Sequence, residues 1–192
     1  MNKEDPLGIV GTLVADKYRV ERLVGEGGFA VVYRAEHTVW QLPVAIKFFN
    51  ALSFVPSAQQ ADFEESFLNE GRLLARLSRR TSSIVQAHDI GTFATPAGTR
   101  IPFLVLEWVD GRTLDDVFEA ERKKGATAWS FQEIRPLLGP VALAMDVVHD
   151  EGVAHRDLKP ANILVLGGDP RREAVRIKIL DFGVAKMMLD NA

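Results

Sequence analysis

Two short motifs near the carboxyl end of the chain constrain its structure more than any other feature. The first is His155–Asn162, which reads His-Arg-Asp-Leu-Lys-Pro-Ala-Asn, and the second is Asp181–Gly183, which reads Asp-Phe-Gly. An isolated His-Arg-Asp is usually a solvated loop. The combined set supplies a carboxylate able to accept a hydroxyl proton, a lysine able to meet phosphate charge, and an amide and a carboxylate oxygen of the kind that Mg²⁺ prefers. Together the motifs indicate a phosphoryl-transfer site.

A hairpin is predicted between the two motifs. Ile163–Leu166 and Val175–Leu180 are rich in strand-forming residues, and the segment between them begins Gly-Gly-Asp-Pro, which favours a turn. Such a hairpin would place Asp181 just beyond a strand end and return it to the same side as Asn162. The two candidate metal ligands are therefore expected to lie close together.

The amino-terminal part of the chain reads as a small sheet with one helix. Runs of apolar and β-branched residues are separated by turn-forming residues, and one long segment instead repeats its apolar residues at helical spacing. The apolar stripe of that segment includes Phe63, Phe67, Leu74 and Leu77, and Glu70 lies on the same stripe. The predicted strands are Tyr18–Val24, Phe29–Ala35, Pro43–Phe49, Ile84–Ile90 and Ile101–Val109, and the predicted helix is Ala58–Arg80.

Beyond Gly111 the pattern changes to helices. Thr113 is a probable N-cap for one helix, because Asp115 and Asp116 fall in its first turn. A longer helix opens at Ser130 with Glu133 in capping-box position, and it ends at Gly152. Its inward residues are expected to be Leu137, Val141, Ala144 and Val148, and Pro136 and Pro140 are expected to bend its first half. A domain boundary is predicted near Glu107–Gly111.

The segment Gly25–Ala30 reads Gly-Glu-Gly-Gly-Phe-Ala and matches a glycine-rich phosphate loop only approximately. The residues that follow are β-formers, whereas a dinucleotide-binding fingerprint would lead into a helix. The Gly-Lys-Ser/Thr of a Walker loop is also absent. Two interpretations stay open on this segment alone: a phosphate-covering hairpin, or a glycine-rich turn with no ligand.

Lys47 lies inside an apolar strand, in the sequence Val-Ala-Ile-Lys. Burying an ammonium without a partner costs several kcal/mol, on the order of other buried-ion penalties. Glu70 poses the converse problem, a carboxylate on the inward stripe of the following helix. We expect the two to form an ion pair beside phosphate groups, the alternative being that each reaches solvent separately.

Composition restricts the partners and the compartment. The net charge of −3 argues against nucleic acid or an anionic membrane surface as the main partner. The chain has no cysteine, which excludes disulfides and thiolate metal sites and fits a reducing compartment. The first residues lack a signal-peptide pattern, and no apolar run approaches the length needed to span a bilayer. We therefore expect a cytoplasmic protein with no membrane segment.

The motifs, taken in order along the chain, resemble those of the eukaryotic-type serine/threonine protein kinases. The resemblance covers roughly residues 16 to 192. It implies an α+β fold of two lobes, with an amino-terminal tail at 1–15, a complete β-rich N-lobe at 16–108, and a partial helical C-lobe at 109–192. The Asp-Leu-Lys-Pro-Ala-Asn wording is similar to that of serine/threonine kinases rather than tyrosine kinases.

The resemblance also implies a role for individual residues. Asp157 would orient and deprotonate the acceptor hydroxyl, Lys159 would neutralise the γ-phosphate, and Lys47 would hold the α- and β-phosphates of ATP with Glu70 behind it. Asn162 and Asp181 would bind Mg²⁺. The remaining nucleotide-binding residues would be Gly25, Gly27, Val32, Ala45, Leu106, Glu107, Val109 and Leu164.

Kinases of this family continue well past the Asp-Phe-Gly motif, whereas only nine residues follow Gly183. We accordingly expect an incomplete catalytic domain, and two functions follow as hypotheses. One is an Mg-ATP-dependent enzyme that phosphorylates serine or threonine in a protein substrate. The other is an ATP-binding regulatory or interaction module without turnover.

Overall fold

The contacts between residues divide the chain into two compact units. The computed structural model describes residues 5–28, 30–50, 60–95, 98–168, 170–171 and 176–181. The first unit takes in the described residues up to Ala75 together with Gln86–Trp108. The second takes in Arg76–Val85 and the described residues from Val109 onward. The chain thus enters the second unit after Ala75, returns to the first after Val85, and enters the second again after Trp108.

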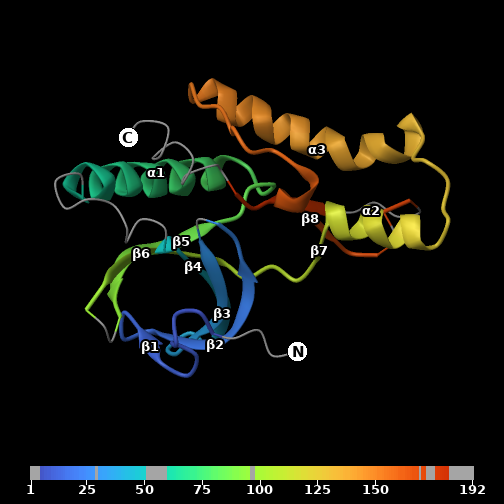
Figure 1. The fold of residues 1–192 in the computed structure, drawn as a ribbon. Helices are drawn as coiled ribbons and strands as arrows, with labels where there is room; N and C mark the ends of the chain where they lie inside the picture. The colour runs from blue at the N-terminus through green and yellow to red at the C-terminus, as the bar shows by residue number, and fades with distance from the viewer. Residues whose placement is uncertain are drawn as a thin grey trace. The chain divides into compact units, whose positions relative to one another are not determined.

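The first unit is built on a six-stranded antiparallel sheet (Figure 1). Each strand pairs with its neighbour in the order β1-β2-β3-β4-β6-β5, so that only β6 and β5 exchange their chain order. Buried and more exposed residues alternate along β3 and β4, as expected of a sheet with one face on a core. The strands are β1 (Leu13–Val14), β2 (Tyr18–Glu26), β3 (Val31–His37), β4 (Leu42–Phe48), β5 (Ala87–Ala94) and β6 (Arg100–Glu107).

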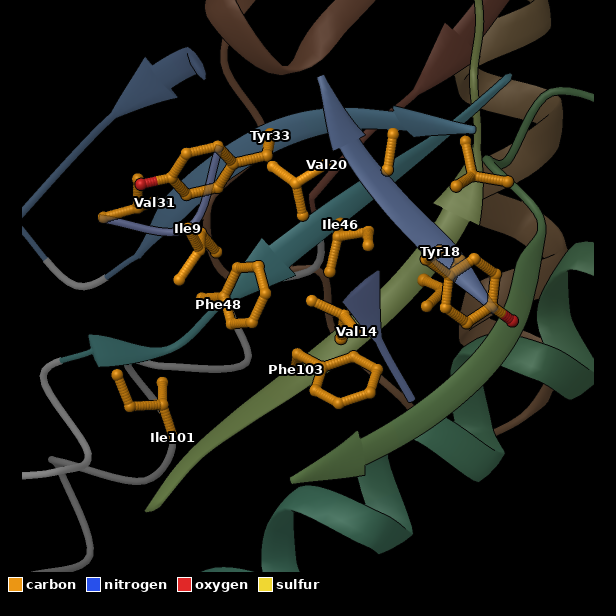
Figure 2. Packing of buried hydrophobic residues seen from close by; sticks show 13 residues of the cluster. Ile9, Val14, Tyr18, Val20, Val31, Tyr33, Ile46, Phe48, Ile101 and Phe103 are labelled. Atoms are coloured by element: carbon orange, nitrogen blue, oxygen red, sulfur yellow. The ribbon is translucent and has the colours of Figure 1, made fainter. Parts of the chain in front are cut away.

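One face of this sheet carries the apolar core of the first unit (Figure 2). Tyr33, Ile46 and Phe48 have no measurable exposure. The Phe48 ring meets Tyr33 edge-on at 5.8 Å between centroids and Phe103 at 5.7 Å. Full burial of one such side chain is worth about 1.5–3 kcal/mol, so this cluster is the main source of stability for the sheet.

The residues that precede the sheet also belong to the core. Ile9 is 1% exposed and joins the cluster. Asp5 fixes the segment, because its carboxylate accepts hydrogen bonds from the Tyr33 hydroxyl and from the backbone N–H of Val10 at 2.8 Å. Neither this packing nor the two-residue strand β1 is predicted by the sequence pattern, which indicates only a tail at 1–15.

The sheet curves until strands that are not neighbours meet. The carboxylate of Asp89 on β5 accepts hydrogen bonds from the Tyr18 hydroxyl on β2 at 2.9 Å and from Lys17 Nζ at 3.0 Å. Between β2 and β5 lie three other strands of the sheet. Burial alone would raise the pKa of Asp89, but the hydrogen bonds from Lys17, Tyr18 and the Ile90 backbone outweigh it, so the pKa is lowered.

Helix α1 (Gln60–Arg80) confirms the predicted helix within two residues of its start. Its apolar stripe is buried at Phe67, Leu74 and Leu77, while Phe63 and Glu70 fall among helix residues whose side chains lie outside the described set. The Phe67 ring packs edge-on against Phe49 at 5.2 Å. A Cβ added at Gly71 would collide with Ile90 on β5, so a glycine here permits the close approach of helix and sheet.

The second unit contains the remaining helices and a small sheet. Helices α2 (Leu114–Lys123) and α3 (Phe131–Asp150) both begin with the predicted caps, Thr113 and Ser130, and each cap forms a full capping box. The four predicted inward residues of α3 are all buried, and the helix continues through Pro136 and Pro140. The sheet runs β7 (Arg112–Thr113), β8 (Ile163–Leu166) and β9 (Arg176–Ile179), with a 3-10 turn at Pro160–Asn162.

The predicted strand Ile84–Ile90 is wrong at its start. Strand β5 begins only at Ala87, while Ile84 forms a parallel bridge with Ile179 on β9 and belongs to the second unit. Ile84 is apolar because it is fully buried there, so its character reflects the core of the second unit and not an extension of the first sheet. Within the described ranges, no helix is both long enough and apolar enough to cross a lipid bilayer.

Candidate active site

The motif His155–Asn162 begins shortly after the end of α3. Gly152 has a φ of 72°, a conformation that residues with a Cβ rarely adopt. Its N–H donates to the His149 carbonyl at 2.9 Å, and the Val153 N–H donates to the Val148 carbonyl at 3.2 Å, which closes the last turn. The predicted helix end is therefore confirmed, and the loop that holds Asp157 begins immediately after it.

The backbone of this loop folds tightly around Asp157. Arg156, the residue before it, has a φ of 60°, in the left-handed region that is uncommon for residues other than glycine. The Asp157 N–H donates to the His155 carbonyl at 2.8 Å. This turn fixes the direction in which the Asp157 side chain leaves the backbone.

Two side chains of the same loop hold the Asp157 carboxylate. Lys159 Nζ lies 2.8 Å from Asp157 Oδ2, and the Asn162 amide nitrogen donates to the same oxygen at 3.0 Å. The Asp157 side chain is 18% exposed, whereas that of Lys159 is 50% exposed. The aspartate is thus held in place at the surface of the loop, while the lysine still reaches solvent.

Asn162 is a buried polar residue of the loop. It is 9% exposed, and its amide nitrogen donates to the Asp157 backbone carbonyl at 2.8 Å as well as to the carboxylate. Because the amide is planar, these two bonds direct Oδ1 away from Asp157. Oδ1 is an uncharged hard oxygen of the type that Mg²⁺ accepts as a ligand.

The predicted hairpin brings Asp181 back to Asn162. Strands β8 and β9 pair with Ile163 opposite Ile179, and the Leu180 N–H donates to the Asn162 carbonyl at 2.9 Å. Asp181 is the next residue along the chain. The two candidate metal ligands therefore lie at the same end of one hairpin, as the sequence predicts.

His155 connects the two carboxylates electrostatically. It is 5% exposed, and burial lowers its pKa below the ordinary histidine value. The charges of Asp181 and Asp157 act in the opposite direction. Both carboxylates are thus close enough to His155 to influence its protonation, which groups Asp157, Asn162 and Asp181 in one region of the second unit.

A second group of candidate residues shares one face of the six-stranded sheet. Opposite the core, the register aligns Gly25, Val32, Lys47 and Leu104 in one row across β2, β3, β4 and β6. The neighbouring row contains Ala45 and Leu106. Alternation places these side chains away from the core that holds Tyr33 and Ile46. Five of the predicted nucleotide-binding residues thus form one surface of the first unit.

Two nucleotide-binding candidates of the first unit, Lys47 and Gly27, have local contacts. Lys47 Nζ lies 5.2 Å from the ring centroid of buried Phe49, and the Gly27 N–H donates to the Ala30 carbonyl at 2.9 Å across the glycine-rich turn. The ion pair expected between Lys47 and Glu70 falls outside the described residues, since no side chain is described for Glu70. It stays a prediction.

The last three predicted nucleotide-binding residues lie at the end of β6, two residues beyond it, and on β8. Glu107 ends β6 and is bound twice to Gln86: its N–H donates to the Gln86 carbonyl at 2.9 Å, and its carboxylate accepts from the Gln86 N–H at 2.8 Å. This double contact is not foreseen from the sequence. Val109 lies two residues after Glu107 and belongs to the second unit, and Leu164 lies on β8 opposite Lys178. The candidate residues thus fall into one set in each unit.

Comparisons with known proteins agree with this arrangement. A family model described as "Protein kinase domain" matches residues 18–192. The chain is 33% identical over 181 residues to a probable serine/threonine-protein kinase PknB of Corynebacterium glutamicum, covering 93% of this chain and 25% of that protein. It is 31% identical over 178 residues to a probable serine/threonine-protein kinase of Clostridium acetobutylicum, covering 93% of this chain and 24% of the relative.

Solved structures show the same fold. The crystal structure of the Mycobacterium tuberculosis PknI kinase domain aligns with a TM-score of 0.67 at 26% identity, covering 91% of this chain and 62% of that domain. The chain spans about a quarter of the length of the curated relatives it matches. The β-rich unit, the capped helices and the hairpin that joins the two motifs are those of a kinase fold. The chain belongs to the protein kinase domain family.

Proposed function

We propose that this chain provides the nucleotide-binding and catalytic residues of a serine/threonine protein kinase, which transfers the γ-phosphate of Mg-ATP to a hydroxyl group of a protein substrate. The observation that carries the proposal is the immobilised Asp157 carboxylate, bound by Lys159 Nζ at 2.8 Å and by the Asn162 amide at 3.0 Å. Phosphoryl transfer depends on positioning and on charge stabilisation, and this loop supplies both.

In the proposed reaction the substrate hydroxyl oxygen forms a bond to the γ-phosphorus while the bond from that phosphorus to the bridging oxygen of ADP breaks. Asp157 orients the hydroxyl and accepts its proton, and the proton then passes to solvent. Lys159 reduces the negative charge that spreads over the transferred group. The products are a serine or threonine phosphate and ADP.

Asn162 and Asp181 fit a magnesium ion. Both offer hard oxygens, and the Asn162 amide nitrogen is already engaged by Asp157, so Oδ1 is the atom presented to a cation. Enzymes of this type commonly bind Mg²⁺ through one or two protein ligands together with phosphate oxygens. When bound, the ion neutralises charge on the phosphates.

The nucleotide would occupy the sheet face described above. Gly25 and Gly27 would cover the phosphates, Val32, Ala45 and Leu106 would contact the base, and Lys47 would hold the α- and β-phosphates with Glu70 as its counter-charge. The backbone of Glu107 and Val109 would hydrogen-bond adenine, and Leu164 would pack against the ring. Support for this surface comes from the register of β2, β3, β4 and β6.

The test is phosphate transfer from γ-labelled Mg-ATP to acceptor proteins, measured with the complete gene product that carries this chain. Asp157→Asn should reduce transfer by about 10²-fold or more, because general-base catalysis contributes on that order. Asp146→Asn, which alters an exposed carboxylate on α3, is the matched control and should leave transfer unchanged. Normal Mg-ADP binding without any Asp157-dependent transfer would instead support a nucleotide-binding regulatory module.

A further inference from the structure

The Trp108 ring lies close to two arginines. The guanidinium carbon of Arg22 lies 5.5 Å from the centroid of the Trp108 ring, and that of Arg34 lies 5.4 Å from it. Both distances are within the range of cation–π attraction, which is strongest for tryptophan. All three residues belong to the first unit. We refer to them as the arginine–tryptophan clamp.

The clamp brings two like charges directly opposite each other. Arg22 on β2 pairs with Arg34 on β3 in the sheet register. Like charges at facing positions of neighbouring strands destabilise a sheet unless other groups offset them. The Trp108 ring offsets both charges, and Glu21 forms an ion pair with Arg34. Arg34 thus contacts both a carboxylate and an aromatic ring.

Trp108 links the end of β6 to strands β2 and β3. Trp108 directly follows Glu107, the last residue of β6, which is fixed to Gln86 by two hydrogen bonds. Strands β2 and β3, which carry the arginines, lead into and out of the glycine-rich turn: Gly25 lies near the end of β2 and Gly27 directly follows the strand. Since β4 lies between β3 and β6 in the sheet, the clamp connects the end of β6 to strands with which β6 does not pair.

We propose that Trp108 is a positioning residue which, through Arg22 and Arg34, holds the backbone at the end of β6 at a fixed separation from the glycine-rich turn. The inference rests on the proposed function, in which the end of β6 binds adenine and the glycine-rich turn covers the phosphates. A fixed separation allows one nucleotide to bind both segments without an ordering cost. Loss of the clamp therefore lowers the affinity for ligands that span both segments more than the affinity for ligands that occupy only one.

The experiment compares Mg-ADP with adenosine by isothermal titration calorimetry on the complete chain. Trp108→Ala should raise the Kd for Mg-ADP by about threefold to tenfold, as expected for loss of cation–π contacts, and should change the Kd for adenosine by less than about twofold. Trp108→Tyr, which retains an aromatic face, should recover most of the Mg-ADP affinity. Arg19→Gln, at an exposed arginine on the same strand as Arg22, is the matched control and should have no effect.

A double-mutant cycle tests the clamp as a unit. The double variant Arg22→Gln/Arg34→Gln leaves Trp108 in place and should raise the Kd for Mg-ADP to the same extent as Trp108→Ala. The triple variant, which combines all three substitutions, should show no further rise in this Kd. Because the double variant keeps Trp108, its Kd for Mg-ADP tests the clamp even if Trp108→Ala does not fold. Thermal unfolding of each variant verifies that the sheet is intact.

Three outcomes would overturn the inference, and they are distinguishable from failure of the proposed function. Unchanged Mg-ADP affinity in Trp108→Ala and in the double variant would contradict the clamp. An equal loss of affinity for adenosine and for Mg-ADP in Trp108→Ala would show that Trp108 has only a local structural role. Additive losses in the triple variant would show that the arginines and the tryptophan act separately. Absence of Mg-ADP binding by the unaltered chain would contradict the proposed function itself, and with it the inference.

Discussion

The Asn162 side-chain amide donates hydrogen bonds to two oxygens of Asp157, the backbone carbonyl at 2.8 Å and carboxylate Oδ2 at 3.0 Å. One residue therefore has two tasks in the proposed site: its nitrogen orients the proton acceptor, and its oxygen is available to a cation. The two tasks use different atoms of the same amide. They can be separated by substitution.

Asn162→Asp tests this division of tasks. The variant keeps an oxygen ligand but replaces the N–H donor with a second carboxylate beside Asp157, so the hydrogen bonds that orient Asp157 are lost and like charges face each other. We expect Mg-ADP binding to persist and phosphate transfer to fall by about tenfold or more, the loss expected when a catalytic group is misplaced. Calorimetry and transfer assays measure the two properties. Asn69→Asp on α1 is the control, and equal transfer by Asn162→Asp and the unaltered protein would contradict the positioning task.

Lys47→Met tests the sheet face as a nucleotide site. The substitution keeps most of the side-chain volume but removes the charge proposed to meet the α- and β-phosphates. Mg-ADP affinity should fall by about tenfold or more, since a charged hydrogen bond is worth about 1.5–3 kcal/mol. Lys123→Met, at an exposed helix position, serves as the control. An unchanged Kd for Mg-ADP in Lys47→Met would place the phosphates elsewhere.

Arg171 links three segments of the second unit. Its guanidinium nitrogens lie 2.7 Å from Glu121 on α2 and 2.8 Å from Glu133 on α3, a third donates to the Thr127 carbonyl at 2.8 Å, and the group stacks on Trp129 at 4.5 Å. Arg171→Ala should reduce the free energy of unfolding by about 1–3 kcal/mol. Arg171→Lys should be intermediate, because an ammonium lacks the planar fork.

Thermal unfolding checks the effect of Arg171. A loss of this size corresponds to a fall in Tm of about 2–4 °C per kcal/mol for a chain of this length. Arg79→Ala, at an exposed arginine near the end of α1, should leave the Tm unchanged. A Tm for Arg171→Ala equal to that of the unaltered chain would show that the three segments are held together by other contacts.

Asp89 predicts a pH dependence of stability. Its pKa is lowered in the folded state, so its carboxylate stabilises the fold at pH values above the unfolded pKa of about 3.9, and the contribution is lost as the pH falls through the lower, folded value. Asp89→Asn should therefore cost about 1 kcal/mol near pH 7, through loss of the charged hydrogen bonds from Lys17 and Tyr18, and progressively less below about pH 4.

Urea unfolding of Asp89→Asn and of the unaltered chain between about pH 3 and pH 7 measures this difference. Asp146→Asn, at an exposed carboxylate on α3, should show no such dependence. A cost for Asp89→Asn that is the same at all pH values would mean that side-chain shape, and not the charge of Asp89, joins β2 to β5.

Local signals in the sequence predict much of the fold. Both capping boxes and the buried stripe of α3 depend on residues a few positions apart, and the paired residues of the β8–β9 hairpin are at most 16 positions apart, so local patterns identify them. The return of Asp181 to Asn162 follows from the same hairpin. Strand β4 is likewise displaced from its predicted range by only one residue, because its alternation is strong.

Contacts between residues far apart in the chain could not be predicted in this way. Ile84 reads as part of a strand because it is apolar, but its partner is Ile179, 95 positions later. The strands β1 and β7 have two residues each, too few for a periodic pattern. The clamp around Trp108 joins residues from three parts of the chain. Each of these features depends on tertiary contacts that no local pattern contains.

A crystal structure of the chain with Mg²⁺ and a non-hydrolysable ATP analogue would test the proposed nucleotide site. We expect one bound nucleotide, with its phosphates in contact with Lys47 and with Mg²⁺ bound by Asn162 Oδ1 and Asp181, so that the two sets of residues act on one ligand. Nucleotide bound away from the face of Val32 and Ala45, or metal bound without Asn162 and Asp181, would contradict it.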